Sequence, residues 1–245
     1  MMFPTAIISL WLLFAGPAQS HALDGRMLPT EVGTSWVYRG TVRWNDTQSH
    51  EIKTKSITMR SELLRVLQRQ DVGATLFLVH GSPSDYDWSE GVAEPSDWLL
   101  VETAKGEVYR FDGGEVSEKL IRFEDQSDAL RDFFDANHLI LRLPLRIGAK
   151  ACDEESSARM DGDYCWIVAS KRVAVIGFPQ RGDATKKLVF LLRFITNPDD
   201  VGIEFASGVG IVSYQYHHHG TIADTRFRLI EMHGPIAGKS EMNPK

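Results

Sequence analysis

The sequence predicts a mainly β protein, in which a curled antiparallel sheet, half-barrel or sandwich-like, is accompanied by one or two short helices. The first observation is an alternation of apolar and polar residues with a period of two, which marks strands that bury one face. It is clearest between residues 36 and 44. The second is that turn residues such as Asn45-Asp46 separate the short apolar runs. The third is that strands and helices do not alternate along the chain, which argues against a parallel, doubly wound sheet.

These patterns predict strands, in chain order, at residues 36–44, 52–59, 63–68, 75–79, 98–102, 108–111, 138–143, 164–170, 173–177, 187–196, 201–206, 210–217 and 225–233. Gly113-Gly114 predicts a turn after one of them. A helix is expected over Ser127–Asn137, because Leu130, Phe133 and Phe134 would share one of its faces.

The first 22 residues predict a cleavable signal peptide. Met1–Ala22 contains no Lys, Arg, Asp or Glu, and its apolar run Ala6–Ala15 is too short for a membrane-spanning helix, which needs about 20 residues. Small residues at Ser20-His21-Ala22 fit a cleavage site, so we expect the mature chain to begin between His21 and Asp24. The protein would then be exported, to the periplasm or the cell exterior. We expect a single β-rich domain over residues 23–235 and a disordered tail over 236–245.

The composition argues against a nucleic-acid partner and against a membrane-spanning segment. The formal net charge is −6, whereas nucleic-acid binding favours a basic stripe. No later apolar run is long enough to cross a membrane, so no transmembrane segment is expected.

The two cysteines, Cys152 and Cys165, are expected to pair. Export takes them to an oxidising compartment, and two cysteines allow one connectivity. The alternative is two unpaired thiols, one of them buried beside Trp166.

Aromatic side chains at both ends of the chain are the candidate ligand-facing residues. The alternation would place Trp36 and Tyr38 on one face of their strand, and Tyr214 and Tyr216 on one face of another. The four could stack across one core. They would then either pack that core or line a wall for an apolar ligand.

Two histidines are weak candidates for a metal. His217 and His219 would share a strand face, but a stable zinc site takes three or four ligands. The alternative is an exposed strand end without a metal. The loop over 81–96 starts like a calcium loop at Asp85, but Glu90 stands where glycine is needed. We therefore expect a mobile acidic loop and no cofactor.

An enzyme is the third choice of function. Residues 76–83 look like the strand and His-Gly turn of α/β-hydrolases, but the chain has no Gly-x-Ser-x-Gly elbow. We therefore name no catalytic residue.

Two segments carry a family resemblance. Leu28–Tyr38 contains a Pro-x-x-x-Gly-x-x-Trp-x-Tyr pattern, and residues 205–216 contain Gly-Val-Gly-Ile-Val, with residues 224–231 following. Together they resemble a group of uncharacterised exported bacterial proteins. The resemblance implies an envelope location and a curled antiparallel sheet like that of periplasmic lipoprotein carriers. This chain lacks the lipid-anchor cysteine of many such proteins.

These observations lead to two main hypotheses of function. The first is an exported, soluble envelope protein whose curled sheet binds an apolar small molecule or a lipid. The second is a structural or interaction module that binds an envelope protein and no small ligand.

Overall fold

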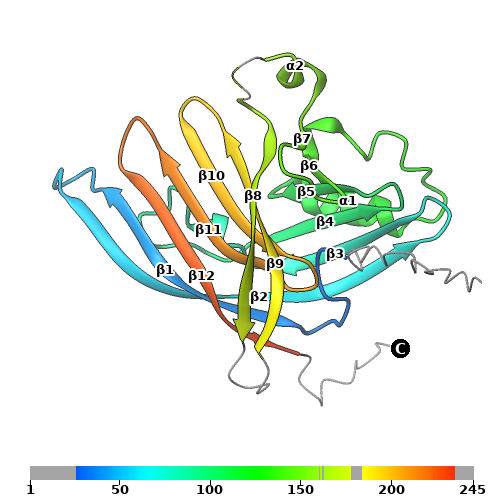
Figure 1. The fold of residues 1–245 in the computed structure, drawn as a ribbon, viewed down its shortest axis with the longest axis horizontal. Coiled ribbons are helices and arrows are strands. Elements are labelled where there is room, and N and C mark those ends of the chain that lie inside the picture. The colour runs from blue at the N-terminus through cyan, green and yellow to red at the C-terminus, as the bar shows by residue number, and fades with distance from the viewer. Residues whose placement is uncertain (1–25, 160, 162, 178–183, 235–245) are drawn as a thin grey trace, which may run out of the picture.

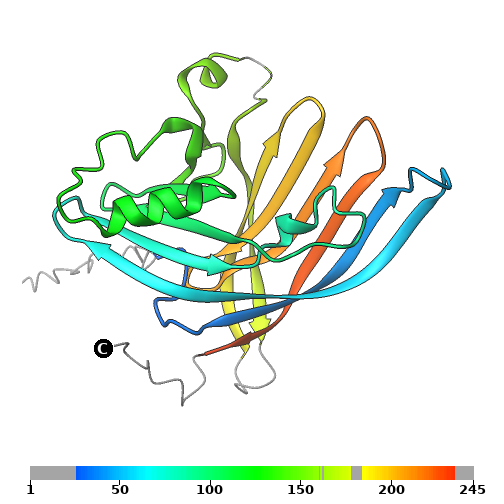
Figure 2. The same ribbon diagram turned by 180° about the vertical axis from the view of Figure 1, so that it is seen from behind.

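The computed structural model describes residues 26–159, 161, 163–177 and 184–234. They form one antiparallel sheet of twelve strands with two short α-helices, so the predicted fold class is confirmed (Figures 1 and 2). The strands are β1 (Ser35–Asn45), β2 (Ile52–Arg69), β3 (Ala74–His80), β4 (Asp97–Thr103), β5 (Glu107–Asp112), β6 (Leu139–Arg142), β7 (Lys150–Ala151), β8 (Trp166–Gly177), β9 (Ala184–Ile195), β10 (Asp199–Ala206), β11 (Gly210–His218) and β12 (Ala223–His233). The helices are α1 (Glu115–Glu124) and α2 (Glu154–Ser157), with 3-10 turns η1 (Pro83–Tyr86) and η2 (Ala136–His138).

The strand order is almost the order of the sequence. It runs β6-β5-β4-β3-β2-β1-β12-β11-β10-β9-β8-β7, so the first and last strands pair in the middle of the sheet. The sheet curls until its two end strands meet, and Arg142 of β6 donates to the Lys150 carbonyl of β7 over 3.4 Å. The result is a nearly closed sheet.

Two pairs of predicted strands are each a single strand in the structure. Residues 52–59 and 63–68 both lie in β2, and residues 164–170 and 173–177 both fall largely in β8. Each long strand carries an irregularity in its pairing, between Leu63 and Arg65 in β2 and between Val168 and Ser170 in β8. A bulge shifts the face to which side chains point, which interrupts the alternation without ending the strand.

The strands β3, β4 and β5 are covered on both faces. One face contributes Phe77, Val79 and Leu100 to the larger of the two hydrophobic clusters, here called the main core. The other face packs against α1 and the segment that follows it (Figure 2). Burial on both sides explains why β3 and β4 have nearly continuous apolar runs.

The helix predicted over Ser127–Asn137 is wrong. This segment consists of turns, and Leu130 has a φ of 51°. Asp128 accepts a hydrogen bond from the Leu130 amide at 2.7 Å, a local bond that competes with helix formation. Leu130 and Phe133 are nevertheless fully buried, so the apolar spacing predicted burial correctly and conformation incorrectly.

The actual helix, α1, starts directly after the predicted turn at Gly113-Gly114. Its C-terminal end is held by Arg69, whose side chain is 1% exposed. The guanidinium donates to the carbonyls of Phe123, Asp125 and Asp128 at 2.8–3.2 Å, and it pairs with Asp71. Arg69 thus supplies partners for carbonyls that the end of the helix leaves free.

The predicted signal peptide, residues 1–22, and the predicted tail, residues 236–245, lie outside the described residues. Among the helices that are described, none combines the length and apolar character needed to span a membrane.

Candidate functional site

The strands β10, β11 and β12 present two chemically different faces. Alternate residues of a strand point to opposite sides of a sheet. One row of paired residues is buried in the main core: Ile203, Tyr214 and Phe227. The neighbouring row points to the opposite side: Glu204, Ser213 and Arg228. We call the first side the inner face and the second the outer face.

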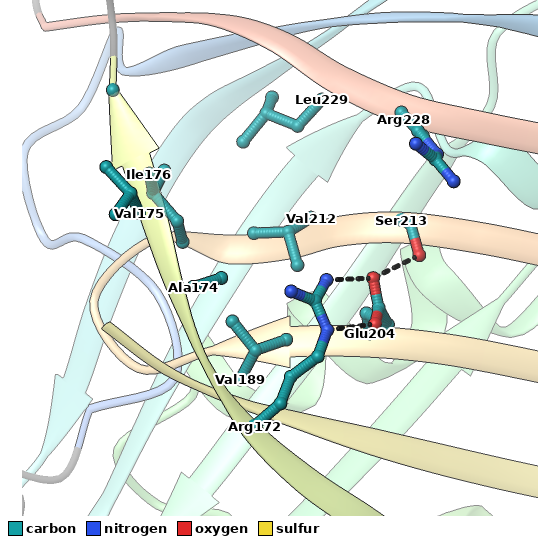
Figure 3. Close-up of a pocket in the computed structure, with 11 residues that line it drawn as sticks. Arg172, Ala174, Val175, Ile176, Val189, Glu204, Val212, Ser213, Arg228 and Leu229 are labelled. Carbon is teal, nitrogen blue, oxygen red and sulfur yellow. Dashed lines mark hydrogen bonds and ion pairs between the residues drawn. The ribbon is translucent and has the colours of Figure 1, made fainter. Parts of the chain in front are cut away.

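A groove lies on the outer face, where the β8–β9 hairpin crosses over β10, β11 and β12 (Figure 3). It encloses about 540 Å³. One part of its wall is aliphatic: Ala174, Val175, Ile176, Val189, Val212 and Leu229. The other part is polar: Arg172, Glu204, Ser213 and Arg228. We call this feature the outer groove.

The polar wall of the outer groove is organised around Glu204. Arg172 donates to both of its carboxylate oxygens, at 2.8 and 2.9 Å, and Ser213 donates at 2.9 Å (Figure 3). The Arg172 guanidinium holds the pKa of Glu204 below its ordinary value, and the positive charge of Arg228 acts in the same direction. Glu204 is therefore an anion at neutral pH, and its charge is already matched by Arg172.

The four aromatic residues singled out in the sequence all lie in the main core. Trp36 donates to the Val209 carbonyl at 2.6 Å, and Tyr38 donates to the Ile211 carbonyl at 3.0 Å. Burial raises the pKa of Tyr38 well above its ordinary value. A small void lined by Trp36 and Tyr38 measures about 10 Å³, less than one small ligand requires.

The hydroxyls of Tyr214 and Tyr216 bind carboxylates on the inner face. Tyr214 donates to Asp87, and Tyr216 donates to Asp199 at 2.7 Å. Burial raises the pKa of Asp87 to about 7 and outweighs the hydrogen bond from Tyr214, which lowers it. One oxygen of Asp87, Oδ1, is buried without a hydrogen-bond partner.

Asp87 belongs to the loop of residues 81–96, which lies against the inner face (Figure 2). Tyr86 of this loop packs its ring 5.3 Å from that of Phe227, and Lys55 donates to the Gly91 carbonyl at 2.8 Å. Asp85 accepts hydrogen bonds from the backbone amides of Ser82 and Ser96. These carboxylates therefore bind protein donors. A void of about 160 Å³ remains beneath the tip of the loop, beside Trp88.

The rings of His217 and His219 lie 4.8 Å apart, while His218 contacts Trp88 and Asp199. His217 pairs with Asp224. Within the described residues, no group of three or more His, Cys, Asp or Glu side chains is placed to hold a metal ion.

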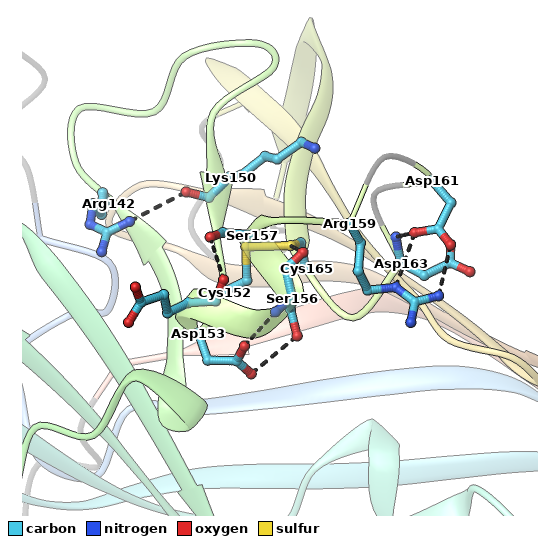
Figure 4. The surroundings of a disulfide bond; sticks show 11 residues. Arg142, Lys150, Cys152, Asp153, Ser156, Ser157, Arg159, Asp161, Asp163 and Cys165 are labelled. Carbon is cyan, nitrogen blue, oxygen red and sulfur yellow. Dashed lines mark hydrogen bonds and ion pairs between the residues drawn. A yellow bond between two sulfur atoms is a disulfide. The ribbon is translucent and has the colours of Figure 1, made fainter.

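Cys152 and Cys165 lie at disulfide distance, with their Cα atoms 4.7 Å apart, and Figure 4 shows the bond between them. The helix α2 lies between them in sequence, and Asp153 caps it by accepting from the Ser156 amide at 2.6 Å. Cys165 is 1% exposed and immediately precedes β8. The bond therefore joins the approach to β8 to the α2 segment.

Sequence reasoning missed the outer groove. Two sequence patterns indicated cationic side chains on the outer face. Arg39 points outward in its strand, and in the Arg-Phe-Arg pattern of residues 226–228 two outward arginines flank a core phenylalanine. Neither pattern shows that β8 crosses over the same face.

No protein-family model matches the chain, and no curated protein matches it. Solved structures that resemble it include two bacterial proteins. One is a candidate lipoprotein from Parabacteroides distasonis, with a TM-score of 0.36 and 12% identity over 85% of this chain and 99% of that one. The other is a candidate exported protein with a YmcC-like fold from Bacteroides fragilis, with a TM-score of 0.41 and 8% identity over the same shares. Similarities of this size carry no argument about function.

Proposed function

We propose that this is an exported protein that binds an amphiphilic small molecule or lipid in the outer groove. The observation that carries the proposal is a groove with one aliphatic wall and one polar wall. Its volume of about 540 Å³ lies within the range of roughly 300–1,000 Å³ typical of small-molecule sites. The two other voids described above are smaller, at about 160 and 10 Å³.

The two walls suit the two ends of an amphiphile. An alkyl chain against Ile176, Val212 and Leu229 would leave water, which favours binding by about 0.8 kcal/mol for each methylene group buried. A polar head would meet the polar wall, which is formed by Arg172, Glu204, Ser213 and Arg228. Neither a purely polar nor a purely apolar ligand would use both walls.

A pair of neighbouring substitutions tests the site. Ala174 lines the outer groove, whereas the adjacent Val173 is 67% exposed and does not line it. We expect Ala174→Phe to fill the groove and to abolish binding of decanol and decanoate in titration calorimetry. Val173→Phe adds an aromatic ring to the same strand and should leave binding unchanged. Equal binding by both variants would refute the outer groove as the site.

Export is supported by the signal-peptide pattern of Met1–Ala22 and by the cysteine pair, which suits an oxidising compartment. N-terminal sequencing of protein recovered from the periplasm or the medium tests it. A mature N-terminus between His21 and Asp24 is expected, and an intact Met1 in that fraction would contradict it.

A second candidate, a protein-interaction module, is favoured by one observation. Val173 and Val175 stand two residues apart on β8 and are 67% and 63% exposed. Such side chains suit a protein contact. Crosslinking in envelope preparations should then give a defined adduct that the Val173→Asp, Val175→Asp double variant loses. An adduct unaffected by the double variant would rule out this patch.

A further inference from the structure

Three arginines form a cluster on the outer face beside the groove: Arg39, Arg226 and Arg228, here called the arginine triplet. Arg39 of β1 and Arg228 of β12 are direct cross-strand partners. Arg226 lies two residues from Arg228 on the same strand and therefore on the same face. All three are exposed.

The arginine triplet differs from the other arginines of this face, which have acidic partners. Arg172 pairs with Glu204, Arg43 with Asp224, and Arg193 with Asp200. In the part of the chain that the structure describes, no side chain of the triplet forms an ion pair or a hydrogen bond. This occurs in a protein whose net charge is −6, so acidic residues are not scarce.

Like charges directly opposite each other on neighbouring strands are destabilising. The pairing of Arg39 with Arg228 therefore has an electrostatic cost. The Glu204 carboxylate attracts Arg228, but both of its oxygens already bind Arg172. A bound anion would offset this cost. Arg228 also lines the outer groove, next to Ser213 and at the opposite end of the groove from Ile176 (Figure 3).

We infer that the ligand of the outer groove is an anionic amphiphile, whose carboxylate or phosphate head binds Arg228 within the field of Arg39 and Arg226. This inference rests on the proposed function, because it names the chemical class of ligand for the same groove. Arg228 is the specificity-determining residue, since a guanidinium binds carboxylates and phosphates with paired hydrogen bonds. Arg172 cannot serve in the same way, because both Glu204 oxygens occupy it.

The test compares ligands that differ only in the head. Titration calorimetry on the purified exported protein would use decanoate, decyl phosphate, decanol and inorganic phosphate. We expect the wild type to bind the two anionic amphiphiles about tenfold more tightly than decanol, as a charge-assisted contact predicts. Arg228→Gln should remove most of that preference, because it weakens the binding of decanoate and decyl phosphate far more than the binding of decanol. Raising the salt concentration should weaken the preference in the wild type.

The matched control is Arg131→Gln, because Arg131 is also exposed and outside the groove. It should bind every ligand like the wild type. If decanoate and decanol bind equally and Arg228→Gln changes nothing, the inference fails while the proposed function stands. If no alkyl ligand binds, or if Ala174→Phe has no effect, the proposed function fails. If inorganic phosphate binds as tightly as decyl phosphate, the site takes a free anion and the inference of an amphiphile is overturned.

Discussion

The strands β3–β5 and the strand β8 belong to one sheet but are exposed to very different degrees. Residues 98–101 of β4 are all buried, whereas residues 169–173 of β8 are all exposed. The first region is packed on both faces by apolar side chains. The second leaves aliphatic and cationic side chains around a groove. The difference indicates that apolar packing on both faces is confined to one part of the sheet, and that the outer groove lies on strands outside that part.

The largest expected effect lies in the packed region, at Arg69. Arg69→Met keeps the length of the side chain but leaves the buried carbonyl of Phe123 and the part-buried carbonyls of Asp125 and Asp128 without their donor. We expect the free energy of unfolding to fall by about 4 kcal/mol, as two or three unsatisfied carbonyls predict. Denaturant unfolding measures it. Arg131→Met, at an exposed position, should change stability by less than about 0.5 kcal/mol. Similar losses of stability in the two variants would contradict the stabilising role of Arg69.

The next effect concerns the link that precedes β8. The Cys152→Ser, Cys165→Ser double variant should lose about 3 kcal/mol of stability, because the bond closes a loop with a sequence separation of 13. Thermal unfolding with and without reductant measures it. Reductant should lower the melting temperature of the wild type alone. Two alkylatable thiols in the native protein would contradict the disulfide.

The third effect is a pH dependence that originates on the inner face. The pKa of Asp87 is raised to about 7 by burial, above an unfolded value of about 4. Its contribution to stability is therefore complete below about pH 4 and is lost as the pH rises through 7. Between pH 5 and 7 we expect a loss of about 2 kcal/mol, at no more than about 1.4 kcal/mol per pH unit.

Asp87→Asn provides the control, since an amide does not titrate. Denaturant unfolding from pH 4 to 8 should show a flatter profile for this variant than for the wild type. Glu102, whose pKa burial also raises to about 7, would maintain part of the slope. A variant profile that parallels the wild type would exclude Asp87 as the source.

The smallest effect has the opposite sign. Arg228→Gln removes one of two directly opposed cations, so we expect the free protein to gain about 0.5 kcal/mol of stability at low salt. The gain should vanish at high salt because mobile ions screen exposed charges. A variant that binds anionic amphiphiles more weakly and has a higher free energy of unfolding would show that Arg228 favours binding at the expense of stability. A destabilised variant would instead assign Arg228 a structural role.

Most of the strands could be predicted from the sequence, because each has its own alternation and its own turn residues. The alternation of β1 correctly predicts that Trp36, Tyr38 and Val42 are buried together. The helix was misplaced because Asp128 and Arg69 act through hydrogen bonds that apolar spacing does not reveal. Val116, Leu120 and Phe123 do recur at helical spacing in α1, so that signal was present.

The outer groove could not be predicted in the same way. Its walls come from five strands, and its residues meet only because β8 crosses the face of β10, β11 and β12. The raised pKa of Asp87 likewise depends on a loop lying against a strand more than one hundred residues away. Local patterns specify the strands, whereas long-range packing creates these environments.

The central pairing of β1 with β12 divides the molecule into two consecutive meanders, β1–β6 and β7–β12. Each can form from neighbouring hairpins, and the two must then dock along one long seam. During synthesis, which starts at the N-terminus, the edge of β1 stays unpaired until the second meander has been made. An open edge of this kind can pair with other chains. Cutting the chain between β6 and β7 should therefore give two fragments that reconstitute the sheet when mixed, because the seam that joins them would be intact.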